Sequence, residues 1–64
     1  MNTKTAFRVD RLELWGRKWV EVGAVPGPNG GIFTTREAAE KRRAGCQLLN
    51  ERDFFVVTAF AVPA

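Results

Sequence analysis

The residue types that carry most enzymatic chemistry are scarce in this chain of 64 residues. It contains no histidine, serine or tyrosine, which excludes a Ser-His-Asp or Cys-His nucleophile arrangement and leaves a zinc site without histidine and with a single cysteine. The single cysteine, Cys46, lies between Gly45 and Gln47. We interpret it as a small core residue of a helix rather than as a reactive thiol.

Acidic pairs and a glycine-rich loop are the other candidates for chemistry. The acidic pairs lie beside arginines or at a helix start, where solvated or capping roles suffice, and they are Asp10 with Glu13, Glu37 with Glu40, and Glu51 with Asp53. The loop glycines before the helix lack the Gly-Lys-Ser/Thr ending of a phosphate loop. We therefore expect no enzyme, no cofactor, no metal and no catalytic residue.

The C-terminal stretch, residues 53–62, is the most strand-like part of the chain and is apolar at odd and even positions alike. Successive side chains of a strand point to opposite faces, so Phe54 and Phe60 face one way and Phe55 and Val57 the other. A chain this short builds one helix and a small sheet. If the helix covers Phe54 and Phe60, then Phe55 and Val57 lie on an exposed apolar face, unless the N-terminal segment or a loop folds over them.

Apolar and polar residues alternate along the N-terminal stretch, but the alternation shifts by one residue part-way. Phe7 and Val9 fall on one face, whereas Leu12 and Leu14 fall on the other. We expect a β-bulge near residues 10–11, because one extra residue brings both pairs to the same face.

A Gly-Arg pair at residues 16–17 predicts a tight hairpin turn into a second strand over residues 18–25. Trp15 and Trp19 flank this turn. The following Pro-Gly-Pro-Asn-Gly-Gly segment, residues 26–31, ends the strand and predicts an exposed loop.

A capping box marks the start of a helix, with Thr34 as N-cap and Glu37 three residues later. The helix is expected to continue to about Leu49. Its sheet-facing stripe is predicted to consist of small residues and one arginine stem: Ala38, Ala39, Arg42, Gly45, Cys46 and Leu49.

The order strand, strand, helix, strand predicts a single small α+β domain over residues 1–64, with residues 1–5 frayed. A right-handed crossover that returns beside the first strand gives a three-stranded antiparallel sheet of order 2-1-3 with one helix on one face. Parallel pairing of the last strand beside the second is the alternative.

Ten Lys and Arg residues against seven Asp and Glu residues give a formal net charge of +3. This mild excess of positive charge is compatible with binding to nucleic acid or to an acidic protein surface, and ordinary solubility explains it equally well. The lone cysteine and the absence of a visible secretory signal favour a cytoplasmic protein. The longest apolar stretch is about half the roughly 20 residues that span a bilayer, so we expect no membrane partner.

The leading hypothesis is a protein-binding module that acts by surface occlusion, with a homodimer as one of its possible forms. Its predicted partner-binding residues are apolar anchors and two arginines that steer it toward an acidic partner: Trp15, Trp19, Phe55, Val57, Arg42 and Arg43. The alternative is a nucleic-acid-binding module that uses basic residues from the hairpin and the helix: Arg8, Arg11, Arg17, Lys41, Arg42 and Arg43.

Three segments resemble one half of a SPOR domain, the peptidoglycan-binding repeat: Trp-Val-Glu-Val-Gly at 19–23, Phe-Thr-Thr-Arg-Glu-Ala-Ala-Glu at 33–40 and Phe-Phe-Val-Val at 54–57. This resemblance covers about one strand-helix-strand unit. In size and style the whole chain is also similar to small strand-strand-helix-strand accessory proteins of phages and mobile elements. Some of those bind and inhibit host proteins, including CRISPR effectors, so this second resemblance implies a host protein as partner.

Overall fold

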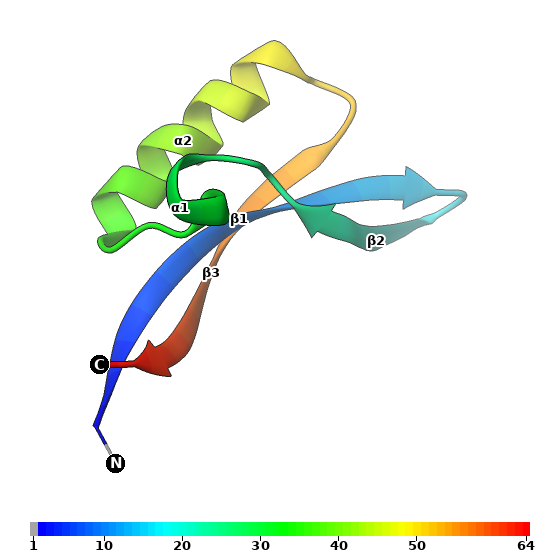
Figure 1. Ribbon diagram of the computed structural model, residues 1–64. Coiled ribbons are helices and arrows are strands. Elements are labelled where there is room, and N and C mark those ends of the chain that lie inside the picture. Colours follow the sequence, from blue (N-terminus) through cyan, green and yellow to red (C-terminus); the bar gives the residue numbers. More distant parts are fainter. Residues whose placement is uncertain (1) are drawn as a thin grey trace.

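The computed structural model describes residues 2–64, with the backbone alone at Pro28. The elements in chain order are β1 (Thr3–Trp15), β2 (Lys18–Ala24), α1 (Pro28–Gly31), α2 (Arg36–Leu49) and β3 (Phe54–Pro63). The three strands form an antiparallel sheet of order β2-β1-β3, and α2 lies across one face of it (Figure 1). The predicted fold class and strand order are confirmed, and the parallel alternative is wrong.

The central strand β1 sets the length of the molecule. Its 13 residues span about 43 Å at about 3.3 Å per residue, which matches the longest dimension of 42 Å. The 14 residues of α2 span only about 21 Å, so the helix covers about half of the length of the sheet. The sheet projects beyond the helix at both ends (Figure 1). Thr3 pairs with Pro63, so the expected fraying is wrong for residues 3–5, and Met1 lies outside the described residues.

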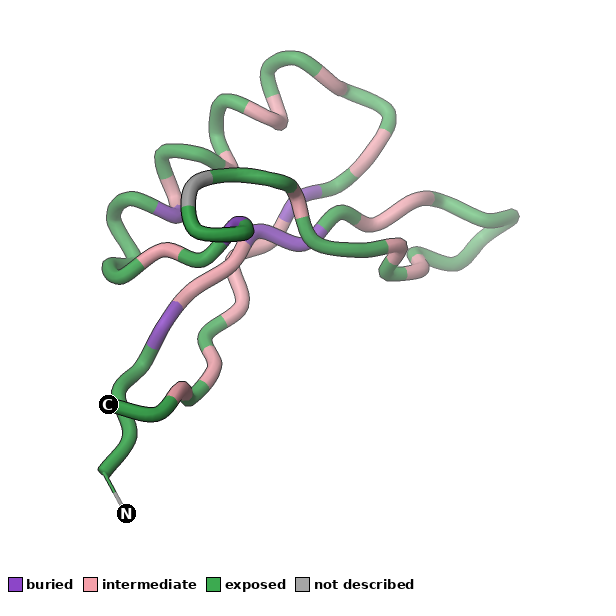
Figure 2. The backbone as a smooth tube through the Cα atoms, in the orientation of Figure 1, coloured by how far each residue is buried: buried purple, intermediate pink, exposed green. Residues whose placement is uncertain are grey.

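The core lies where α2 crosses β1 and β3 (Figure 2). Val9, Ala39 and Phe55 are buried there. The partly buried side chains packed against them are Phe7, Val25, Phe33, Cys46 and Val57. Cys46 is thus part of the core, as predicted.

The helix covers the face of β3 opposite to the one expected. Phe55 is 4% exposed, whereas Phe54 is 48% exposed, so the expectation that Phe55 and Val57 form an exposed face is wrong. The reason lies in β1, where Val9 is apolar and its neighbours Arg8 and Asp10 are charged. Because Val57 pairs with Val9, the apolar face of β1 draws Phe55 and Val57 beneath the helix.

The helix begins one residue later than expected and turns a different stripe to the sheet. Thr35 is the N-cap, and its Oγ1 accepts a 3.2 Å hydrogen bond from the Ala38 N–H. Of the predicted stripe Ala39 is buried and Cys46 partly buried. The members that are exposed instead are Ala38, Arg42, Gly45 and Leu49. The stripe is rotated because Gln47, on the inner side of α2, binds the turn into β3.

The irregularity in the hairpin lies in β2. The register passes from Arg11 opposite Gly23 to Leu12 opposite Glu21, so Val22 is the extra residue. Because β1 pairs with β3 without a shift from Thr3 to Leu12, Leu12 stays on the face opposite to Val9. The prediction of a bulge in β1 that gathers all the apolar residues on one face is therefore wrong.

Both connections around β2 rely on glycine. Gly16 has φ +67° in the two-residue turn between β1 and β2, which confirms the predicted hairpin. The segment after β2 contains the short helix α1 and is held against the sheet. Gly31 is buried with φ +87°, and a Cβ there would lie 2.6 Å from the carbonyl oxygen of Val25. Phe33 then exchanges two backbone hydrogen bonds with Phe7, of 2.9 and 2.8 Å.

Candidate binding surface

The face of the sheet turned away from α2, here called the helix-free face, carries an apolar cluster at its hairpin end. Register pairs place Leu12 opposite Phe54 and Leu14 opposite Trp19, and residues paired across strands share a face. The exposed fractions are 52% for Leu14, 46% for Trp19 and 48% for Phe54. The Trp19 and Phe54 rings are 5.8 Å apart between centroids and tilted by 48°, a favourable aromatic pairing.

A polar group lies at the centre of the same face. Asp10 is 3% exposed, and its Oδ2 accepts a 2.6 Å hydrogen bond from the Thr58 hydroxyl. The Arg8 Nε lies 3.1 Å from Asp10 Oδ1, and the Arg8 guanidinium lies over the Phe60 ring at 5.5 Å. Glu21 approaches Arg8 from β2 at 4.0 Å. Arg8, whose side chain is 41% exposed, is therefore held in one orientation beside the apolar cluster.

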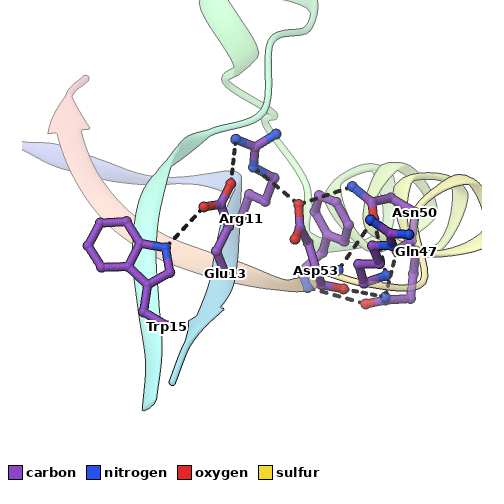
Figure 3. Close-up of polar contacts among 8 residues, drawn as sticks. Arg11, Glu13, Trp15, Gln47, Asn50 and Asp53 are labelled. Atoms are coloured by element: carbon purple, nitrogen blue, oxygen red, sulfur yellow. Dashed lines mark hydrogen bonds and ion pairs between the residues drawn. The ribbon is translucent and has the colours of Figure 1, made fainter. Parts of the chain in front are cut away.

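A chain of polar contacts occupies the other side of the hairpin (Figure 3). The Trp15 Nε1–H donates a 3.1 Å hydrogen bond to Glu13, which also accepts one of 3.2 Å from Arg11. Arg11 in turn lies 3.6 Å from the Asp53 carboxylate at the start of β3. Trp15 is paired with Lys18, on the face opposite to the Leu14–Trp19 pair. Of the four predicted apolar anchors, only Trp19 lies on the helix-free face.

The two arginines predicted to steer a partner lie on α2 and have partners within the chain. The Arg43 Nε donates a 3.0 Å hydrogen bond to Glu40. Arg42 donates one of 3.1 Å to the carbonyl oxygen of Pro26. Arg42 therefore holds the segment after β2 against the helix, which gives it a structural role in addition to any role in binding.

The six residues of the predicted nucleic-acid surface do not form one patch. Arg8 and Arg11 lie on opposite faces of β1, and each is paired with carboxylates. Arg17 lies in the hairpin turn, whereas Lys41 lies on α2 with Arg42 and Arg43. Within residues 2–64 neither Arg17 nor Lys41 makes an ion pair.

Sequence reasoning missed Leu14 and Phe54 as members of the exposed surface. The charges of Arg8 and Asp10 were the available signal, because they mark the even positions of β1 as the side away from the core. It also missed Leu48, which is 83% exposed beside Leu49 at 90% on the outer side of α2.

An open depression of about 490 Å³ lies between α2 and the segment before it, and it is lined by Gly27, Phe33, Ala38, Lys41, Arg42 and Gly45. A hollow of about 290 Å³ lies between the end of β2 and the core, and Arg11 is its one charged lining residue. Its volume is at the lower limit of small-molecule sites, about 300 Å³. Among residues 2–64 no three acidic or cysteine side chains lie close enough to share a metal ion, and no helix there is long and apolar enough to cross a membrane.

Comparison of the chain with protein-family models, with curated proteins and with solved structures gives no match. The resemblances to a SPOR repeat and to phage accessory proteins therefore stay predictions. The helix-free face and its apolar cluster are therefore the basis for a proposal about function.

Proposed function

We propose that the protein is a small non-enzymatic protein-binding module that covers an apolar site on a partner protein with its helix-free face. The observation that carries this proposal is the apolar cluster, in which Leu14, Trp19 and Phe54 are each about half exposed and lie on one face of three adjacent strands. Contiguous apolar surface on a small domain marks an interaction site, and tryptophan is among the residues that contribute most to interface energies.

The composition of the face defines the chemistry of a suitable partner. The cluster fits an apolar patch or pocket, and its side chains extend from a hydrogen-bonded sheet, so they lose little conformational freedom on binding. Beside it, Arg8 offers free donors toward a carboxylate or carbonyl group of the partner while Asp10 fixes its position. The resemblance to phage accessory proteins makes a host protein the partner class to examine first.

Two tryptophans on opposite faces provide a matched test of this proposal. Trp19→Ala and Phe54→Ala are expected to weaken partner binding by about 10- to 100-fold or more, because hot-spot truncations cost about 2 kcal/mol or more. Trp15→Ala removes an equally large, 60% exposed side chain from the other face and is expected to leave the affinity unchanged. Candidate partners are recovered with the intact protein from a lysate of the source organism, purified, and titrated by calorimetry against all four proteins. Equal losses in Trp15→Ala and Trp19→Ala would refute the assignment of the face.

Nucleic acid binding is the outcome that would replace this proposal. The basic residues are spread over both faces and partly paired, so we expect no tight complex with duplex or single-stranded DNA in fluorescence anisotropy titrations. An affinity that falls steeply with salt, with a slope reduced by Arg42→Gln and Arg43→Gln, would favour a nucleic-acid-binding module instead.

A further inference from the structure

The outer edge of β3 is the second surface that the fold leaves open. Phe7 directs both of its backbone hydrogen bonds to Phe33, on the side of β1 away from β3. The backbone N–H and C=O groups of the odd-numbered residues of β1 therefore point away from β3. Those of the even-numbered residues, such as Arg8, form hydrogen bonds with their partners in β3, such as Thr58. It follows that the odd-numbered residues of β3 direct their N–H and C=O groups to the open edge.

Gln47 shows that this edge accepts an amide partner where α2 reaches it. Its Oε1 accepts a 3.2 Å hydrogen bond from the Phe55 N–H, and its Nε2 donates one of 2.8 Å to the carbonyl oxygen of Asp53. These are the bonds that a neighbouring strand makes with alternate residues. Beyond Phe55, the outward N–H groups of Val57, Ala59 and Ala61 have no hydrogen-bond partner within residues 2–64.

Between Phe55 and Pro63, β3 lacks the features that protect sheet edges. Residues 54–62 contain no charged residue, their pairing with β1 has no bulge, and the single proline is at position 63. The other edge of the sheet, β2, carries Lys18 and Glu21 and a bulge at Val22. Long uncharged edges are pairing sites for another strand, whereas charges and bulges oppose such pairing.

The geometry points to a second copy of this chain as the occupant, with two β3 strands paired antiparallel about a two-fold axis at Ala59. In this register Ala59 faces its own copy and Val57 faces Ala61 of the other copy. Every outward N–H of the three residues then meets a carbonyl group. The strand is uncharged, so no like charges meet, and the small exposed side chains of Ala59 and Ala61 leave room for the second strand. Gln47 ends the available edge at Phe55, which confines the pairing to residues 57–61.

The paired molecule has a six-stranded sheet of order β2-β1-β3-β3-β1-β2. A two-fold axis perpendicular to the sheet keeps both α2 helices on one side. The two helix-free faces then join into one continuous surface on the other side, with the two apolar clusters at its far ends. This pairing of the two chains does not depend on which protein binds that face.

Amide hydrogen exchange tests the pairing on the protein by itself. As protein concentration rises from low micromolar to millimolar, we expect the amides of Val57, Ala59 and Ala61 to exchange more slowly, because they become bonded in the dimer. The Thr58 and Phe60 amides bond to β1 and serve as internal controls that stay protected throughout. Concentration-independent exchange of the three outward amides would overturn the proposal.

Disulfide trapping tests the register. With Cys46→Ala as background, Ala59→Cys is expected to form a covalent dimer, because directly opposed Cα atoms in a hydrogen-bonded pair are about 5.5 Å apart and disulfides span about 4.4–6.8 Å. Ala61→Cys is the matched control, since its copies are expected about 13 Å apart at about 3.3 Å per residue. Trapping at Ala61→Cys alone, or at neither site, would refute the Ala59-centred dimer.

A charge at the edge separates this inference from the proposed function. Ala59→Lys is expected to keep the chain monomeric in sedimentation equilibrium, whereas Ala44→Lys, at an exposed helix position, adds the same charge and leaves the dimer intact. Trp19→Ala is expected to leave the dimer intact while it weakens partner binding. Loss of the dimer in Trp19→Ala but not in Ala59→Lys would place self-association on the helix-free face and overturn the edge pairing.

Discussion

Asp10 is the residue whose environment departs most from its chemical type. It is a carboxylate at 3% exposure in a 64-residue domain, and it is held by the hydroxyl of Thr58 and the guanidinium of Arg8. A buried charge persists only when such partners replace water. The contacts join β1 to β3 and fix Arg8 on the face that we propose to bind a partner.

Removal of the Asp10 carboxylate is expected to destabilise the fold. Asp10→Ala leaves the hydroxyl of Thr58 and part of Arg8 without partners, so the free energy of unfolding is expected to fall by about 1–3 kcal/mol in urea denaturation. Glu21→Ala is the control, because the Glu21–Arg8 pair at 4.0 Å is exposed and contributes at most about 1 kcal/mol. A larger loss in Glu21→Ala than in Asp10→Ala would contradict this account of the cluster.

At the scale of elements, the joint between α2 and β3 holds the last strand in the orientation that pairing with β1 favours. Gln47 binds the backbone on both sides of Phe54, at Asp53 and at Phe55. Asn50 adds a 3.0 Å hydrogen bond to the Asp53 carboxylate (Figure 3). These bonds fix the turn, so β3 enters the sheet with Phe55 toward the helix and Phe54 toward solvent.

Adjacent phenylalanines in β3 are expected to respond oppositely to truncation. Phe55→Ala opens a cavity in the core and is expected to cost about 3–5 kcal/mol, which is comparable with the whole stability of a domain this small. Phe54→Ala removes a half-exposed ring and is expected to leave the chain folded. Far-UV circular dichroism and urea denaturation measure both effects. Equal losses in the two variants would mean that the described burial of β3 is wrong.

At the scale of the whole molecule, a narrow sheet of 42 Å carries a helix that covers about half its length. The core is therefore small, and both the edge of β3 and the helix-free face remain open. Association through either surface adds buried area that the single chain lacks. A partner that binds only the folded chain raises the stability of that chain.

Edge pairing makes thermal stability depend on protein concentration. A tenfold rise in concentration adds about 1.4 kcal/mol per dimer, or about 0.7 kcal/mol per chain. For a domain of this size the Tm is then expected to rise by about 3–6 °C per tenfold increase. Differential scanning calorimetry of the intact protein and of Ala59→Lys measures this, and a rise of the same size in Ala59→Lys would contradict edge pairing.

The candidate surface was predictable only in part. Trp19 was identified from the sequence as an exposed anchor, and the structure adds Leu14 and Phe54 beside it. The sequence also predicts Trp15 as an anchor on that surface. The register pairs it with Lys18 on the other face, a distinction that depends on strand pairing rather than on sequence distance.

The sequence by itself determined the order of elements, the hairpin at residues 16–17 and the end of the helix at Leu49, and it favoured the antiparallel sheet of order β2-β1-β3 over the parallel alternative. Turn glycines, alternation of apolar and polar residues, and capping residues are local signals, so they can be recognised in the sequence without knowledge of the fold. The covered face of β3 was decided only by tertiary structure, because Phe54 and Phe55 are equally apolar. Pairing of Val57 with Val9 beneath α2 made that choice, and it thereby determined which surface stays open to a partner.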